Sequence, residues 1–246
     1  MGQGILSWSV QKKIIMGRPR EFDRDVALRR AMELFWERGY EAVSLAELVT
    51  ELGISKPSLY AAFTNKEALF REAVELYTRT EGKTAEAALM NEPTARAGVE
   101  AMLRNNAKQY CTKGRPRGCM VVLAASVGSA ESEEVRAFLA GLRKEGRAML
   151  VRRVERGKRD GDVSPSADAE RIATFYSTVL AGLSVQARDG ASSATMNRVI
   201  DDALAIWDAL AAHIDLARKR FAEQAGSIPA QLDQMEAARR ARGNPG

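Results

Sequence analysis

The sequence is poor in the residue types that build metal sites and covalent cross-links, with two cysteines and one histidine among 246 residues. Two cysteines cannot form the framework of a disulfide-rich domain. Together with His213 they are also too few for a zinc site of cysteine and histidine ligands. We therefore expect no bound metal, and no motif in the chain suggests a cofactor.

Long apolar stretches are also missing. The longest largely apolar run, residues 119–127, covers nine residues, whereas a membrane-spanning helix needs about 20. Residues 1–15 lack the basic start and apolar core of a secretory signal. These absences predict a cytoplasmic protein without a membrane partner, and the chain is long enough to bury a core of its own.

Sustained alternation of β-branched residues is absent, whereas helical spacing of apolar residues runs through the chain. Asp23 is suited to begin a helix that ends before Gly39, and Thr64 with Glu67 predicts a capping box that opens a helix over residues 65–83. The later helices are expected over residues 94–112, 132–158, 167–188 and 194–222. The predicted fold class is therefore all-α.

The charge of the chain is mildly basic, with a net charge of +5 and a pI near 9.3. This balance alone is a weak indicator of nucleic-acid binding. Basic residues also recur over residues 143–159, where eight occur. We interpret that run as the solvated face of an amphipathic helix.

Residues 44–63 have the pattern of a helix, a glycine-centred turn and a second short helix. Ser44 and Glu47 are spaced as a capping box. Gly53 can adopt the positive φ that a sharp turn requires, and Ser55 can cap the second helix. This is the pattern of a helix-turn-helix DNA-binding motif.

The second helix of this motif has an apolar side, formed by Leu59 and Phe63, and an outer side without acids. No carboxylate occurs between Glu51 and Glu67, and such a surface tolerates a phosphate backbone. The predicted helix N-termini add backbone donors for phosphate. The residues expected to face outward are Lys56, Ser58 and Tyr60.

Spaced motifs extend this pattern over residues 17–80. They are Gly17-Arg-Pro-Arg-Glu-Phe-Asp23, Ala31-Met-Glu-Leu-Phe35, Gly39-Tyr40, Glu47-Leu48, Gly53-Ile-Ser-Lys-Pro-Ser-Leu-Tyr60, Phe63 and Asn65-Lys-Glu-Ala-Leu-Phe70. Together they resemble the amino-terminal domain of the TetR family of transcriptional repressors. Family members commonly begin just before Gly17, so we interpret residues 1–15 either as an overlong start or as a non-native extension.

The resemblance implies a homodimer that binds a palindromic operator in double-stranded DNA and releases it when a small-molecule effector binds. Such a protein is a ligand-responsive repressor and not an enzyme. A flexible arm would reach the minor groove through Arg18 and Arg20. The other positions that match DNA contacts of the family are Ser44, Ser55, Lys56, Pro57, Ser58, Tyr60 and Lys66. The alternatives are an ordinary disordered terminus for Arg18 and Arg20, a core position for Tyr60 and simple solvation for Lys66.

The chain is predicted to have four parts. Residues 1–20 form the flexible basic arm and residues 21–81 the helix-turn-helix domain. Residues 82–225 form a helical bundle for ligand binding and dimerisation, and residues 226–246 form a disordered tail.

Inward positions of the central helices predict an apolar pocket with a few hydrogen-bonding groups. No buried charge stands out, so we expect an uncharged, lipophilic or aromatic effector. The expected lining residues are Met102, Asn106, Tyr110, Val122, Phe138, Met149, Phe175, Tyr176 and Thr178.

The last two long helices carry apolar or small residues on more than one side. This pattern, together with the family resemblance, favours an intermolecular four-helix bundle. The residues expected at the dimer seam are Ile172, Val179, Leu183, Val199, Leu204 and Trp207.

Other functions are weighed against this one. Cys111 and Cys119 flank a basic segment that favours a reactive thiolate, although a free cysteine is more often a small buried apolar residue. A constitutive or thiol-switched DNA-binding regulator is therefore the alternative. An all-helical enzyme is disfavoured because the chain shows no nucleophile–base pair, metal-ligand spacing or phosphate-binding glycine loop.

Overall fold

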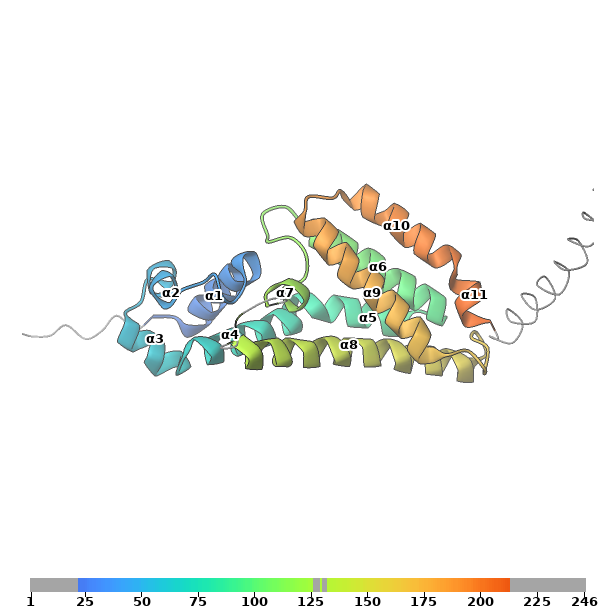
Figure 1. The fold of residues 1–246 in the computed structure, drawn as a ribbon, viewed down its shortest axis with the longest axis horizontal. Helices are drawn as coiled ribbons and strands as arrows, with labels where there is room; N and C mark the ends of the chain where they lie inside the picture. The colour runs from blue at the N-terminus through green and yellow to red at the C-terminus, as the bar shows by residue number, and fades with distance from the viewer. Residues whose placement is uncertain (1–21, 126–128, 130–131, 213–246) are drawn as a thin grey trace, which may run out of the picture.

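The computed structural model describes residues 22–125, 129 and 132–212. Every regular element in these ranges is helical, which confirms the all-α prediction (Figure 1). The elements are α1 (Arg24–Arg38), α2 (Leu45–Leu52), α3 (Lys56–Phe63), α4 (Lys66–Tyr77), the π-helix η1 (Thr78–Gly82), α5 (Lys83–Asn91), α6 (Ala95–Tyr110), α7 (Met120–Leu123), α8 (Glu133–Asp160), α9 (Ala169–Arg188), α10 (Ser193–Ala205) and α11 (Trp207–Ala211). The arm with Arg18 and Arg20, His213 and the predicted tail lie outside the described residues.

The helix starts follow local capping rules, with one departure. Asp23 accepts from the amides of Asp25 and Val26, and Ser44 with Glu47 forms the predicted box. The expected box at Thr64 is wrong, because Thr64 has a φ of 64° and Asn65 is the residue that accepts from the Ala68 amide, at 2.7 Å. The helix that follows also differs, since the π-helix η1 interrupts it after Tyr77 and α5 continues it to Asn91.

The first of two hydrophobic cores lies between α1, α2, α3 and α4. Phe35 and Phe70 meet edge to face with ring centroids 5.1 Å apart, and Trp36 meets Tyr77 in the same way at 4.9 Å. Residues far along the chain complete this core, because α7 and the start of α8 also pack into it. The core of the predicted helix-turn-helix domain, residues 21–81, is therefore completed by residues of α7 and α8, which lie outside that range.

The second core lies between α6, α8, α9, α10 and α11. Tyr176 is fully buried there and donates its hydroxyl to the Ala203 carbonyl at 3.1 Å, and burial raises the pKa of this phenol to about 12. Four residues expected at the dimer seam belong to this core instead. They are Ile172, Leu183, Leu204 and Trp207. Because these side chains are buried within their own chain, they are not available to a second chain.

Arg153 contradicts the prediction that the basic run over residues 143–159 is a solvated face. Its side chain is fully buried. The guanidinium donates to the carbonyls of Leu89 at 3.1 Å and Glu92 at 3.0 Å, at the carboxyl end of α5. Desolvation by burial lowers the pKa of this group. A buried cation therefore ties α8 to free carbonyls at the end of α5, where the helix dipole is negative.

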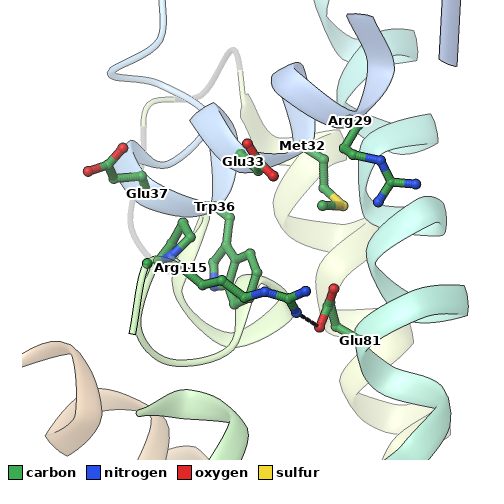
Figure 2. A pocket seen from close by; sticks show the side chains of 9 residues that line it. Arg29, Met32, Glu33, Trp36, Glu37, Glu81 and Arg115 are labelled. Carbon is green, nitrogen blue, oxygen red and sulfur yellow. Dashed lines mark hydrogen bonds and ion pairs between the residues drawn. The ribbon is translucent and has the colours of Figure 1, made fainter. Parts of the chain in front are cut away.

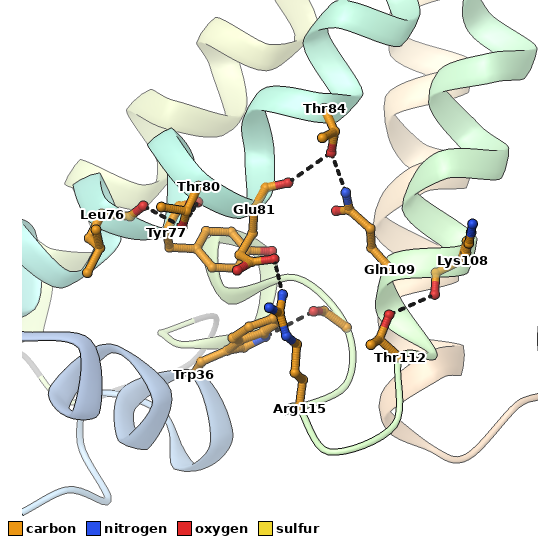
Figure 3. A network of polar contacts seen from close by, with 11 residues as sticks. Trp36, Leu76, Tyr77, Thr80, Glu81, Thr84, Lys108, Gln109, Thr112 and Arg115 are labelled. Atoms are coloured by element: carbon orange, nitrogen blue, oxygen red, sulfur yellow. Dashed lines mark hydrogen bonds and ion pairs between the residues drawn. The ribbon is translucent and has the colours of Figure 1, made fainter. Parts of the chain in front are cut away.

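Hydrogen bonds join the end of α1 to the segment between α6 and α8. Trp36 donates its indole Nε1–H to the Gly118 carbonyl at 2.9 Å, and the Tyr40 amide donates to Ala124 at 2.7 Å. Figure 3 shows the neighbouring polar network, in which Glu81 on η1 pairs with Arg115 at 2.5 Å. A cleft of about 360 Å³ opens between α1, η1 and residues 114–116 (Figure 2).

Candidate DNA-binding surface and ligand pocket

The turn between α2 and α3 has the geometry that its sequence predicts. Gly53 has φ 66° and ψ 29°, a left-handed conformation that costs a side-chain-bearing residue about 1–2 kcal/mol. Ile54 is buried beneath the turn, and Leu59 and Phe63 of α3 are buried on its inner side. The angle of α3 is therefore set by apolar contacts on one side only.

The opposite side of α3 is open. Ser55, Lys56, Pro57 and Tyr60 are exposed, and Tyr60 retains 39% exposure as one of the few large apolar side chains at the surface. A core position for Tyr60 is thus wrong. Ser58 is half-buried. Its hydroxyl lies 2.8 Å from that of Ser55, and the Ser55 hydroxyl also accepts from the Ser58 amide.

Two further predicted DNA contacts lie at the starts of α2 and α4. Ser44 is exposed and occupies the N-cap of α2. Lys66, in the first turn of α4, is half-buried with its Nζ 4.3 Å from the centroid of the Tyr40 ring. Burial lowers the pKa of this ammonium group, and the Glu41 carboxylate opposes that effect. Lys66 is therefore held in place by a cation–π contact and is not simply solvated.

Arg24 holds the end of α3 in place. Its guanidinium donates to the Ala62 carbonyl at 3.3 Å and to the Glu72 carboxylate on α4 at 2.6 Å. It also lies over the Phe63 ring, 4.5 Å from the centroid. The sequence analysis missed this positioning residue, because its partners are 38 and 48 residues away along the chain.

A second candidate feature is a partly open pocket of about 560 Å³ between α5, α6, α7, α8 and α9. Such a volume is typical of small-molecule sites. The structure brings six of the nine predicted residues to its wall: Met102, Asn106, Tyr110, Val122, Met149 and Thr178. The Asn106 amide donates to the Met102 carbonyl at 2.8 Å, and burial raises the pKa of Tyr110 well above its ordinary value.

Three predicted pocket residues lie elsewhere. Phe138 packs against the first core, with the Arg71 guanidinium 4.7 Å from its ring centroid. Phe175 packs edge to face on Tyr176 at 5.0 Å. Tyr176 is itself committed to the second core. All three residues lie on the inward side of their helices, as the helical spacing predicts, but that side packs against a core and not against the pocket.

The pocket wall also carries charge that the sequence analysis did not anticipate. Arg143, Lys144 and Arg147 of α8 line it together with Glu86 of α5. Arg143 is oriented by a hydrogen bond from its Nη1 to the Val121 carbonyl at 2.8 Å. The premise behind an uncharged effector, namely a wall without charge, is therefore wrong.

The outward sides of α9 and α10 carry exposed apolar residues. Val185 is 43% exposed, Val199 is 44% exposed and Ile206, between α10 and α11, is 40% exposed. Gly182 is exposed and Val179 is half-buried on the same two-helix layer. Of the residues predicted for the dimer seam, Val179 and Val199 keep surface for a partner.

The two cysteines lie beside the junction between the cores. Cys111 is half-buried, with its Sγ 3.4 Å from Nη2 of Arg117. Cys119 is half-buried and lines the pocket, and its backbone amide donates a hydrogen bond to the Ser184 hydroxyl at 2.8 Å.

Comparison with known proteins agrees with this arrangement of a helix-turn-helix unit and a helical bundle. Residues 27–73 match the family described as bacterial regulatory proteins, tetR family. Residues 93–203 match the tetracyclin repressor-like C-terminal domain. None of the described helices combines the length and apolarity that crossing a membrane requires.

Individual relatives support the same assignment. The chain is 34% identical over 199 residues to the HTH-type transcriptional repressor ComR of Escherichia coli (strain K12), covering 79% of this chain and 93% of ComR. It is 32% identical to the repressor BdcR of the same strain, covering 72% and 85%. The solved structure of a CifR cysteine mutant, a TetR-family regulator complexed with 26-base-pair operator DNA, is 48% identical with a TM-score of 0.75, covering 77% of this chain and 100% of that chain.

The fold and the motif thus define a DNA-binding transcriptional regulator of the helix-turn-helix class, which is not an enzyme. The chain belongs to the TetR family, as its motifs predicted.

Proposed function

We propose that this protein is a cytoplasmic repressor that binds a palindromic operator as a homodimer, and that a small molecule in the pocket lowers its affinity for DNA. The observation that carries this proposal is the pairing of an exposed recognition helix with a pocket whose wall includes α9. Arg188 at the end of α9 donates hydrogen bonds to the Trp36 and Glu37 carbonyls of α1. The ComR and BdcR names support repression, and the CifR complex supports operator DNA as the partner.

The proposed DNA contacts follow from the exposed side of α3. Lys56 and Tyr60 are the long side chains on this side, and Pro57 and Ser55 shape its start. The N-termini of α2, α3 and α4 offer backbone amides to phosphates. Ser44 and Lys66 would contact the backbone at the edges, with the Lys66 ammonium shared between a phosphate and the Tyr40 ring. Arg18 and Arg20 remain proposed minor-groove contacts.

The proposed dimer uses the exposed side of α9 and α10. Small and apolar residues there, namely Gly182, Val185, Val199 and Ile206, allow two copies of the helix pair to approach closely. A two-fold dimer presents two recognition helices, which fit half-sites about 34–36 Å apart on one face of the duplex. This symmetry is the reason to expect a palindromic operator.

The test is a selection of bound DNA from a random library, followed by affinity measurements at several salt concentrations. Replacing Lys66 by Ala should reduce the slope of log K against log salt by about 1.8 in magnitude, since a dimer loses the proposed Lys66–phosphate contact in each half-site. The matched control is Lys108→Ala, an exposed lysine on α6. Equal slopes and affinities for the two variants would contradict the proposed docking.

A thiol-switched regulator is the second candidate. It is favoured by the Arg117 guanidinium at 3.4 Å from the Cys111 sulfur and by the position of Cys119 on the pocket wall. The double variant Cys111→Ser, Cys119→Ser separates the candidates. If a small-molecule effector still releases operator DNA from this variant, the ligand-responsive repressor is supported. If oxidants release DNA from the wild type but not from this variant, the thiol-switched regulator is supported.

A further inference from the structure

We propose that the effector is an amphipathic acid, a molecule with an apolar chain or ring system and one anionic group, and that Arg147 and Arg143 bind the anionic group. This inference rests on the proposed function, because it takes the pocket between α5 and α9 as the effector site. It replaces the uncharged effector that the sequence suggested. The structural basis is the unequal distribution of charge over the pocket wall.

The pocket wall has two chemically different parts. Most of it is apolar, with Leu89, Met102, Met149, Leu150 and Leu180 among its residues. One stretch of α8 is basic instead. Arg143 and Arg147 are spaced i,i+4 and Lys144 and Arg147 are spaced i,i+3, so both pairs are neighbours on the surface of α8. Among the described lining residues, Glu86 is the single acid, against three basic residues.

The basic stretch has no ion-pair partner among the residues that the structure describes. Across the described ranges, the ion pairs join other residues, and none involves Arg143, Lys144 or Arg147. Arg143 and Arg147 are half-buried. Arg143 donates one hydrogen bond to the Val121 carbonyl, and the other N–H groups of its guanidinium remain available to a ligand. Arg147 has no protein acceptor in the same ranges.

These facts favour an anion because a half-buried guanidinium next to an apolar cavity has lost part of its hydration. A carboxylate restores its hydrogen bonds in a bidentate geometry. A neutral ligand would leave the cation underhydrated, and a cationic ligand would meet three like charges and only the exposed Glu86. The apolar part of the wall then accepts a chain or ring system, for which about 560 Å³ is sufficient.

The experiment compares three probes with the same chain, namely decanoate, decanol and decylammonium, by calorimetry on the full-length protein. Decanoate should bind about tenfold or more tightly than decanol, the ratio expected from one charge-assisted hydrogen bond, and decylammonium should bind weakest. Arg147→Gln should abolish the preference for decanoate, whereas Arg147→Lys should retain part of it. Arg152→Gln, an exposed arginine of α8 outside the pocket wall, should leave it unchanged.

The inference is overturned if decanol or decylammonium binds as tightly as decanoate, if Arg147→Gln and Arg143→Gln both keep the preference, or if none of the three probes binds. A parallel measurement of operator affinity by fluorescence anisotropy tests the proposed function separately. Decanoate that binds through Arg147 without weakening operator binding supports the ligand class and refutes the release mechanism. A neutral compound that weakens operator binding equally in wild type and Arg147→Gln supports the release mechanism and refutes the proposed ligand class.

Discussion

The contact between Arg188 and the end of α1 predicts how the two cores communicate. Arg188 lies in the last turn of α9, and its two terminal nitrogens donate to consecutive carbonyls of α1. Nη1 is 2.6 Å from the Glu37 oxygen and Nη2 is 2.7 Å from the Trp36 oxygen. Pocket residues Thr178 and Ala181 belong to the same helix. A ligand that shifts α9 would therefore displace α1 of the DNA-binding domain through these two hydrogen bonds.

The substitution Arg188→Gln removes both charge-assisted hydrogen bonds. Each contributes about 1.5–3 kcal/mol when a charged donor is shielded from water. The Glu37 contact is exposed, however, and the guanidinium is only half-buried, with a pKa that burial lowers. Solvent screening and the recovered hydration of the freed carbonyls reduce the sum. We therefore expect the free energy of unfolding to fall by about 2 kcal/mol.

The substitution should also weaken the coupling between effector and operator. Coupling free energies are typically about 1–3 kcal/mol, and loss of the clasp should remove a large part of this. Operator affinity measured with and without effector gives the coupling directly, and urea unfolding gives the stability. Because linkage is reciprocal, effector affinity with and without operator must show the same loss.

Two further variants complete this design. Arg188→Lys keeps the charge but not the fork, so its effects should be intermediate. Arg171→Gln changes an exposed arginine in the first turn of α9 and should leave both stability and coupling unchanged. If Arg188→Gln retains wild-type stability and wild-type coupling, α9 does not act on α1 through this contact.

Two other predictions concern the dimer and acid stability. Val199→Lys should place an unpaired charge in the proposed interface and shift sedimentation from dimer to monomer, whereas Val26→Lys, at an equally exposed valine of α1, should stay dimeric; a dimeric Val199→Lys protein would move the interface elsewhere. Hydrogen bonds from Ser132 and the Ser129 amide lower the pKa of Glu41, so its contribution to stability is present at neutral pH and is lost as the pH falls through this lowered pKa. The variant Glu41→Gln should lack that acid-dependent step in unfolding curves, and an identical pH profile would show that the carboxylate contributes nothing.

The helix-turn-helix unit could be read from the sequence because its determinants are local. Ser44 and Glu47 lie three residues apart, and Gly53 meets the turn's need for positive φ without any distant partner. The outward position of Lys56 and Tyr60 follows from the burial of Leu59 and Phe63 on a short helix with one apolar side. Even here the exact cap was missed, since Thr64 and Asn65 are both suitable by residue type and only the backbone decides between them.

The pocket was only partly predictable, because each central helix has neighbours on several sides. Helical spacing marked Phe175 and Tyr176 as inward, and they are, but they face the second core and not the pocket. The same ambiguity hid the basic stretch of the wall. Arg143 and Arg147 have the spacing of a solvated face, and only the packing of α5 and α9 beside α8 turns them toward a cavity.

Long-range contacts decided the remainder. Arg153 is buried because the carbonyls at the end of α5, more than 60 residues away, accept its hydrogen bonds. Val199 stays at the surface while Leu204 is buried, although both are apolar residues of one helix. The sequence by itself determined the class of the protein and its DNA-binding motif through local spacing. The tertiary structure alone decided which apolar and charged residues remain for a ligand or a partner, because that choice depends on which sides of each helix its neighbours cover.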